Sequence, residues 1–413
     1  MDRARRFPQG SQLLVAAVLI FAGTYLTLAA GRIPYFRVDR TGAAIIGASL
    51  MLACNVLTVE EAYAAINYDT IILLFGMMIV VANLRLSGFF GVVSGWVVEH
   101  AHGPLVLLAG IVAVAGVFSA FFVNDTMCLV LTPLVLDITR RLGRRPVPYL
   151  LAVAMASNIG SVATITGNPQ NMMIGSFSLI PYRTFAAALA PVAAAGLVLT
   201  VAVIALVYRA EFRHGTPLEV PHRPVRVNRP LLWKSLAVSA GMIVFFFAGW
   251  PVPKVAVIAG ALLLITRRVK PEKVYREIDW SLLVLFIGLF IVIAGLEKTP
   301  VPERLFAAAG RFHLDRIPVL CGFSALLSNL VSNVPAVLVF KAFVSHLANP
   351  ARAWLALAMS STLAGNLTLL GSVANLIVVQ RARSEVEITF TEYARAGVPL
   401  AILSLAAGVW MLN

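Results

Sequence analysis

The feature that most constrains this chain is a segment that occurs twice. Residues 151–171 read LAVAMASNIGSVATITGNPQN, and residues 355–375 read LALAMSSTLAGNLTLLGSVAN, at a constant offset of 204 positions. Each copy follows a short apolar stretch with an asparagine at its centre, Asn124 in the first case and Asn333 in the second. Small, Asn-rich interruptions repeated in two apolar halves are expected at the binding site of a secondary transporter.

The composition places the chain in a membrane. Hydrophobic residues make up 60% of the 413 residues and charged residues 13%, whereas soluble domains average about 25% charged residues. Several apolar runs reach the ~17–25 residues that cross a bilayer. No signal peptide precedes the first run, so we expect residues 13–30 to be a true span. The net charge of +14 comes from basic loops, which predicts a lipid bilayer and no nucleic acid as partner. The three cysteines lie in apolar runs and predict no disulfide framework.

The apolar runs follow the same order in both halves. In the first half we expect plain spans at 12–30, 42–57, 69–85 and 184–208. We also expect an interrupted pair of helices at 104–138, a broken span at 148–178 and a further helix at 86–100. In the second half we expect their counterparts at 231–249, 252–267, 280–296, 316–347, 352–382 and 393–412.

The interrupted pairs are too short for two full crossings each. We therefore predict re-entrant hairpins with tips at Asn124–Asp125 and Ser332–Asn333, since irregular backbone at that depth persists only where it is buried in protein or lines a cavity. Five crossings remain in each half, and an odd number inverts the second half relative to the first. The predicted fold class is an all-α polytopic membrane protein, an inverted-repeat transporter with about ten transmembrane helices, two re-entrant hairpins and two broken helices. The predicted domains are a first repeat (1–208), a linker (209–230) and a second repeat (231–413).

Loop charge predicts the orientation. Arg and Lys gather in the loops near residues 32–40, 140–145, 209–234 and 267–276, whereas the opposite segment 59–69 is acidic. The positive-inside rule places the basic loops in the cytoplasm. Both termini then face outward from the inner (plasma) membrane, and the Pro-rich linker is cytoplasmic. The basic N-terminal sequence MDRARR argues for the reverse, but the internal loops outnumber it.

Asp125 is the acidic residue nearest to the predicted midplane site. Carboxylates at that depth are expensive and by default mark an ion or proton path. Burial raises the pKa of a carboxyl, which allows it to exchange a proton near neutral pH. The structural alternative is that Asp125 only caps the next half-helix; we favour proton coupling, because a cap can also serve the site. Asp137, one turn before Arg140 and Arg141, is expected to pair at the membrane surface.

The other candidate residues are neutral. Gly permits a break in each span, Pro169 cannot continue the helix, and unwinding frees carbonyls and half-helix N-termini for a solute or ion. For any single Ser or Thr, helix packing is the simpler explanation, but for the duplicated set we favour a site. The expected solute- or ion-binding residues are Asn124, Thr126, Asn158, Thr164, Gly167, Asn168, Asn171, Ser332, Asn333, Ser361, Asn366, Thr368, Gly371, Ser372 and Asn375.

These motifs contain no Arg, Lys or His. This slightly favours a neutral, hydroxyl-rich solute or a weak anion over a dianion, although helix N-termini or a co-bound Na⁺ could replace a fixed cation. The six histidines lie in or near loops and make no ligand cluster. We therefore expect no metal site and no cofactor, with H⁺ as the coupling ion and Na⁺ as the alternative.

Three motifs carry a family resemblance: VNDTMCLVLTP (123–133), Ser-Asn-x-Gly-Ser-x-Ala-Thr (157–164) and GNPQN (167–171). Together they resemble the ion transporter superfamily, and within it the arsenite-efflux permease branch with the plant silicon efflux transporters. Divalent-anion/Na⁺ symporters of this superfamily carry Ser-Asn-Thr at both tips, where this chain has Val123-Asn124-Asp125 and Ser332-Asn333-Val334. The resemblance covers nearly the whole chain. It implies ten spans with two hairpins, export of arsenite or silicic acid against protons, and an elevator-type homodimer.

The sequence thus predicts a secondary active transporter, not an enzyme. Its solute would be a small hydroxylated metalloid or inorganic oxyanion, silicic acid or arsenite, exported in exchange for protons. The alternative is a Na⁺-coupled symporter of dicarboxylate, sulfate or phosphate. No H-E-x-x-H zinc motif and no G-x-x-x-x-G-K-[ST] phosphate loop occurs, so an intramembrane enzyme or a primary pump has little support. A passive channel remains a third option.

Overall fold

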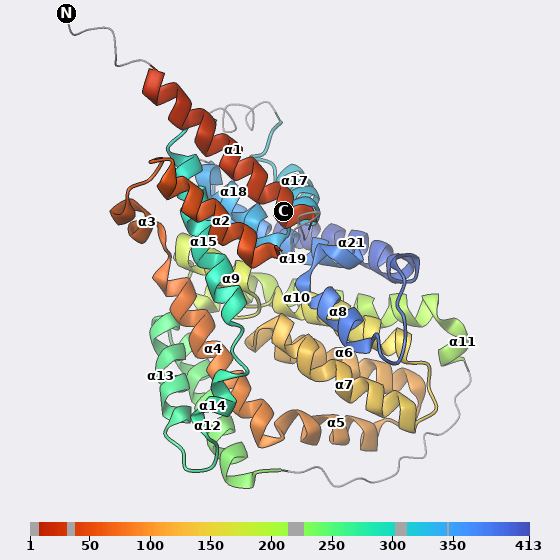
Figure 1. Cartoon of the computed structure of the whole chain (residues 1–413). Helices are drawn as coiled ribbons and strands as arrows, with labels where there is room; N and C mark the ends of the chain where they lie inside the picture. Colours follow the sequence, from red (N-terminus) through yellow and green to blue (C-terminus); the bar gives the residue numbers. More distant parts are fainter. Residues whose placement is uncertain (1–7, 31–37, 214–226, 302–311, 345–346) are drawn as a thin grey trace, which may run out of the picture.

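The computed structural model describes the chain except for residues 1–7, 31–37, 214–226, 302–311 and 345–346. The described residues form helices and connecting segments, with no strand among them (Figure 1). This confirms the predicted all-α, inverted-repeat membrane fold. Six helices in the described part have the length and hydropathy to cross a membrane, namely α4 (Tyr68–Ser87), α6 (Pro104–Phe121), α10 (Tyr182–Val207), α12 (Arg229–Phe247), α15 (Trp280–Glu297) and α21 (Phe390–Leu412).

The other apolar helices outside the hairpins and broken spans are α1 (Pro8–Ala30), α2 (Arg40–Ala53) and α13 (Val252–Leu264). The helix expected at 86–100 is α5 (Phe89–His100). Two segments that the sequence suggested were loops contain short helices, α3 (Val59–Ala65) and α14 (Pro271–Tyr275). Of the expected linker, residues 209–213, which include α11 (Arg209–Phe212), and residues 227–230 are described, and residues 214–226 lie outside the described residues.

Both expected hairpins are present. The first consists of α6 and α7 (Asn124–Arg141), joined by Phe122, which is extended, and Val123. The second consists of α17 (Ile317–Val331) and α18 (Asn333–Val344), joined by Ser332, whose φ of 79° allows an abrupt turn. The first helix break thus falls one or two residues before the expected tip Asn124–Asp125, and the second falls at Ser332, within the expected tip Ser332–Asn333. The two asparagines begin the second helix of each hairpin.

The two broken spans also follow the duplicated sequence. The first consists of α8 (Pro146–Ser161) and α9 (Pro169–Ser178), and the second of α19 (Pro350–Leu363) and α20 (Val373–Ala382). Two 3₁₀ turns, η1 (Ala364–Asn366) and η2 (Leu369–Gly371), fill the second break. Asn168 and Ser372 occupy equivalent positions before α9 and α20, where each side chain accepts a backbone N–H bond as the N-cap.

The two halves interlock through a symmetric pair of close crossings. Helix α4 packs on α13 of the other half, and α15 packs on α2 (Figure 1). A Cβ added at Gly76 would lie 2.6 Å from the backbone carbonyl carbon of Ala256, and one added at Gly288 would lie 2.8 Å from that of Ala44. Small residues allow such backbone contact between membrane helices. Each half therefore supplies one partner of both crossings.

Candidate binding site

The duplicated asparagines near the end of each copy hold the two breaks in the same way. Asn171 Nδ2 donates to the carbonyls of Ser161 and Thr164, at 3.0 Å in both cases. Asn375 Nδ2 donates to Gly365 and Thr368 carbonyls, at 2.7 and 3.2 Å. All four acceptors correspond at the same offset of 204 positions. These amides satisfy carbonyls that the interrupted helices leave without helical partners.

A second set of hydrogen bonds crosses between the halves. Asn168 Nδ2 donates to Thr362 Oγ1 (3.2 Å), and Ser372 Oγ donates to Asn158 Oδ1 (2.9 Å). These two contacts are also related by the repeat, because Asn158 corresponds to Thr362. Asn158 makes further bonds across the halves, because its Nδ2 also donates to Asn366 Oδ1 (2.8 Å) and Asn375 Oδ1 (3.0 Å). The breaks of the two spans are therefore joined side chain to side chain.

The hairpin tips are tied to these breaks. The Asn124 backbone N–H donates to the Gly167 carbonyl (3.0 Å), and its Nδ2 donates to Asn158 Oδ1 (3.2 Å). In the amide orientation that best satisfies its neighbours, Asn333 Nδ2 donates to the carbonyl of Gly371 (3.2 Å) and its Oδ1 accepts from Gln170 Nε2 (3.2 Å). Asn124 Oδ1 is buried and has no partner among the described residues, so it remains an acceptor for a bound group.

A cavity of about 60 Å³, here called the tip cavity, lies where the two tips and the two breaks meet. At about 30 Å³ per water, it has room for a very small solute. The tips line it with Asn124, Asp125, Val331, Ser332, Asn333, Val334 and Pro335, and the broken spans line it with Pro169, Gln170, Ser372 and Val373. Leu28 of α1, Arg40 of α2, and Leu282, Leu285 and Phe286 of α15 complete the lining.

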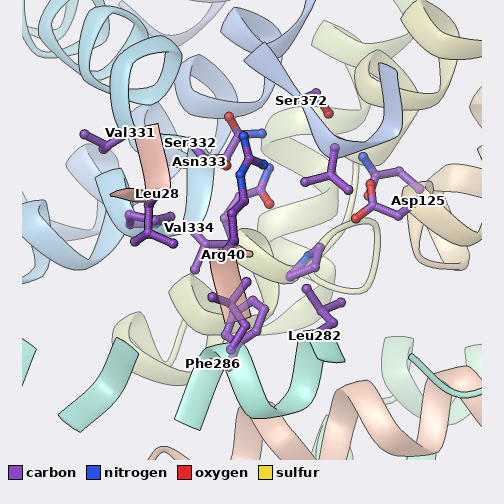
Figure 2. Close-up of a pocket in the computed structure, with 16 residues that line it drawn as sticks. Leu28, Arg40, Asp125, Leu282, Phe286, Val331, Ser332, Asn333, Val334 and Ser372 are labelled. Atoms are coloured by element: carbon purple, nitrogen blue, oxygen red, sulfur yellow. The ribbon is translucent and has the colours of Figure 1, made fainter. Parts of the chain in front are cut away.

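Arg40 and Gln170 are the polar residues of the cavity lining that the sequence prediction did not include among the site residues. Figure 2 shows the side chain of Arg40 extending between the hairpin tips, with Ser332 and Asn333 on one side and Asp125 on the other. The duplicated motifs contain no Arg, Lys or His, but the structure places the guanidinium of Arg40, from outside these motifs, in the lining of the cavity. Arg40 was interpreted as one of several basic loop residues, and its place at the start of α2 gave no sign that this helix meets the tips.

The expected site residues fall into two groups. Asn124, Asp125, Ser332, Asn333 and Ser372 line the tip cavity directly. Nine of the other candidates do not line the cavity and belong to the breaks of the two spans or to the helix ends beside these breaks. They are Asn158, Thr164, Gly167, Asn168, Asn171, Ser361, Asn366, Thr368 and Gly371. Thr126 is half-buried beside Asp125 but is not part of the lining. The structure thus separates residues that can touch a solute from residues that hold the breaks open.

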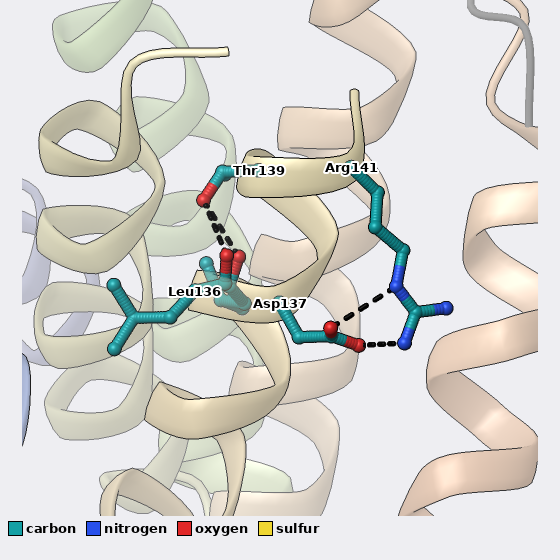
Figure 3. Close-up of polar contacts among 5 residues, drawn as sticks. Leu136, Asp137, Thr139 and Arg141 are labelled. Carbon is teal, nitrogen blue, oxygen red and sulfur yellow. Dashed lines mark hydrogen bonds and ion pairs between the residues drawn. The ribbon is translucent and has the colours of Figure 1, made fainter. Parts of the chain in front are cut away.

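Asp137, unlike Asp125, is paired with an arginine and does not line the cavity, as expected. Arg141 Nε donates to Asp137 Oδ1 (3.0 Å), and a second nitrogen of the same guanidinium pairs with Oδ2 (Figure 3). Both residues lie one turn apart near the end of α7, where Thr139 bonds back to the carbonyls of Val135 and Leu136. Asp125 is therefore the carboxylate of this hairpin that faces the cavity.

Apolar helices, two opposed hairpins and a small amide-lined cavity between broken spans define a polytopic membrane transporter. The chain belongs to the citrate transporter family (CitMHS), which matches residues 16–364. This agrees with the predicted membership of the ion transporter superfamily. The family and the relatives below are named as transporters or membrane proteins.

Three relatives and one solved structure illustrate the similarity. The chain is 30% identical to the silicon efflux transporter LSI3 of Oryza sativa subsp. japonica, with 92% of this chain and 94% of that protein covered. It is 31% identical to a 46 kDa membrane protein of Mycobacterium leprae (96% and 98% covered), and 24% identical to the putative transporter arsB of Dictyostelium discoideum (90% and 87%). The crystal structure of the Alcanivorax borkumensis YdaH transporter matches 98% of this chain and 97% of its own, with a TM-score of 0.59 at 16% identity, which supports the fold.

Proposed function

We propose that the protein is a proton-driven antiporter that exports a small hydroxylated metalloid or inorganic oxyanion, silicic acid or arsenite, across the plasma membrane. The observation that carries this proposal is the lining of the tip cavity, where Asp125 is the carboxylate among the described lining residues and lies with amides, hydroxyls and the guanidinium of Arg40. The names of the silicon efflux and arsB relatives support the solute class.

The exchange follows from the two protonation states of one carboxyl. Ionised Asp125 only accepts hydrogen bonds, so it can bind the hydroxyls of a neutral solute. Protonated Asp125 loses part of that acceptor capacity and presents a donor instead. Solute and proton therefore compete for the same group, which is the requirement for antiport. Asp279, at the N-cap of α15, acts on Asp125 through its charge, and Arg40 lines the same cavity as Asp125.

The orientation favours loading from the cytoplasm. A larger cavity of about 420 Å³, here called the vestibule, is lined by Asp39, Arg40, Asn329 and Ser332 among others. It shares Arg40 and Ser332 with the tip cavity. Asp39 and Arg40 of its lining end the basic segment 32–40, which the positive-inside rule places in the cytoplasm. An exporter would bind its solute from that side, and we further propose that it does so as a homodimer.

The test is transport in proteoliposomes under an imposed pH gradient, with arsenite and silicic acid as solutes. Asp125→Asn should abolish pH-driven exchange while the protein remains folded in the membrane. Asp137→Asn is the matched control, because it removes a carboxylate of the same helix that pairs with Arg141 outside the cavity. Full pH-driven exchange in Asp125→Asn would refute the role of Asp125 as proton carrier.

The alternative is a Na⁺-coupled symporter of a dicarboxylate, sulfate or phosphate. Two observations favour it: the guanidinium of Arg40 in the cavity and the citrate named in the family's description. Uptake of citrate, succinate or sulfate that follows a Na⁺ gradient and ignores pH would replace our proposal with this one.

A further inference from the structure

Arg40 lies at the junction of the two cavities. It is the first residue of α2 and is half-buried, and it lines both the tip cavity of about 60 Å³ and the vestibule of about 420 Å³. Leu28 and Ser332 are the other residues common to both linings. A solute that passes from the vestibule to Asp125 therefore passes the Arg40 side chain.

The charge of Arg40 has no partner within the described part of the chain. The carboxylate next to it, Asp39, accepts from the Gly42 backbone N–H (2.8 Å) as the N-cap of α2. Within the described residues, the tip cavity has two ionisable groups in its lining, Arg40 and Asp125. A half-buried guanidinium without a partner is costly unless another charge or a bound group compensates it.

Both charges come from the first repeat. At the hairpin offset of 209, Asp125 corresponds to Val334, which lines the same cavity without a charge. At the offset of 212 that relates α2 to α13, Arg40 corresponds to Val252. The cavity is therefore formally neutral when Asp125 is ionised and carries one positive charge when Asp125 is protonated.

We propose that Arg40 determines the charge selectivity of this site by cancelling the carboxylate of Asp125. An ionised carboxylate accepts, and a guanidinium donates. A hydroxyl group can satisfy both, because it is donor and acceptor at once, whereas a fully deprotonated oxyanion can only accept. The pair therefore selects neutral, protonated solutes and rejects anions until Asp125 is neutralised. This inference rests on the proposed function and names the basis of its solute selectivity.

The experiment measures equilibrium binding to the full chain in nanodiscs at neutral pH. The probes are arsenite and silicic acid as neutral solutes, and sulfate as the anion. Arg40→Gln should weaken binding of the neutral solutes by at least about tenfold, since it removes hydrogen bonds from a charged donor. Asp125→Asn should gain sulfate binding by a similar factor, and the double variant Arg40→Gln, Asp125→Asn should lose that gain.

Two further variants separate charge from folding. Arg40→Lys keeps the charge without the planar fork, so it should retain the preference for neutral solutes with weaker binding. Arg183→Gln removes an exposed arginine from the first turn of α10, outside both cavities, and should match the wild type. All variants are compared as monodisperse protein.

The affinities for the neutral solutes and for sulfate decide the inference. Neutral-solute affinity in Arg40→Gln within about twofold of wild type overturns it; so does sulfate binding in Asp125→Asn that persists in the double variant, or a wild type that binds neither class. If pH-driven exchange is absent but these effects of Arg40 on binding are present, only the proposed proton coupling is refuted, so the two failures are distinguishable.

Discussion

The two repeats are alike in geometry and different in charge. Asn171 and Asn375 bind equivalent carbonyls, and Asn168 and Ser372 reach equivalent partners in the opposite half. At the cavity, however, the first repeat contributes Asp125 where the second contributes Val334. The repeated sequence thus produces two matching helix breaks, whereas the ionisable side chains of the cavity lining, Arg40 and Asp125, both come from the first repeat.

The repeats also differ in how tightly each hairpin packs on its broken span. A Cβ added at Gly160 of α8 would collide with the backbone of Gly116 on α6. The corresponding residues of the second repeat, Ala325 and Ala364, already carry a Cβ. Helices α6 and α8 therefore approach more closely than their side chains would otherwise allow, and the first hairpin has less freedom to shift.

The largest effect on folding is expected at this crossing. Gly160→Ala should destabilise the protein by about 1–3 kcal/mol or more, because the obstructing atoms are backbone. Gly241→Ala on α12 is the control, since a Cβ there meets nothing within 4 Å. The measurement is the yield of monodisperse protein and its midpoint of thermal unfolding in detergent. Equal behaviour of the two variants would show that the close packing of the first repeat is not needed.

An intermediate effect is expected from the paired asparagines. Asn171→Ala removes two side-chain hydrogen bonds, and Asn171 Oδ1 has no partner among the described residues. Asn375→Ala removes two equivalent bonds and also the one from Asn158 Nδ2. It should therefore cost about 1 kcal/mol more. Thermal unfolding of both variants checks the order, and a larger loss in Asn171→Ala would contradict the assignment of these bonds.

The smallest effect is expected at the capping box of α3, which α14 of the second repeat lacks. Hydrogen bonds from Lys298 and from the Thr58 backbone hold the pKa of Glu61 below its usual range. A lowered pKa in the folded state means stability that is present above the ordinary glutamate pKa and lost as the pH falls through the folded value.

Wild type should consequently lose more thermal stability than Glu61→Gln between pH 7 and pH 4, by about 2 °C or less. Solubilised protein is heated at both pH values, and the difference between variants is compared, because other carboxylates titrate in both. An equal loss in wild type and Glu61→Gln, or a larger loss in Glu61→Gln, would mean that Lys298 does not act on Glu61.

Much of this architecture could be predicted from the sequence because the same segment occurs in both halves of the chain. The offset of 204 positions located both breaks, and Asn124 and Asn333, the first residues of α7 and α18, located both hairpins. The crossing bonds of Asn158 with Asn366 and Asn375 were not predictable, because a repeat reveals which residues are equivalent and not which ones touch. Arg40 was missed for the same reason: it meets the tips across helices distant in sequence, and its own neighbourhood resembles an ordinary basic loop.

The crossings of α4 with α13 and of α15 with α2 bear on how the protein is made. During synthesis, α4 enters the membrane long before its partner α13 has left the ribosome, and Gly76 then has no Ala256 to pack against. The amide of Asn158 likewise lacks its hydrogen-bond acceptors until Asn366 and Asn375 have been synthesised. The first half must persist in the bilayer with its polar groups provisionally satisfied, and the cavity is completed only when the last third of the chain has been inserted.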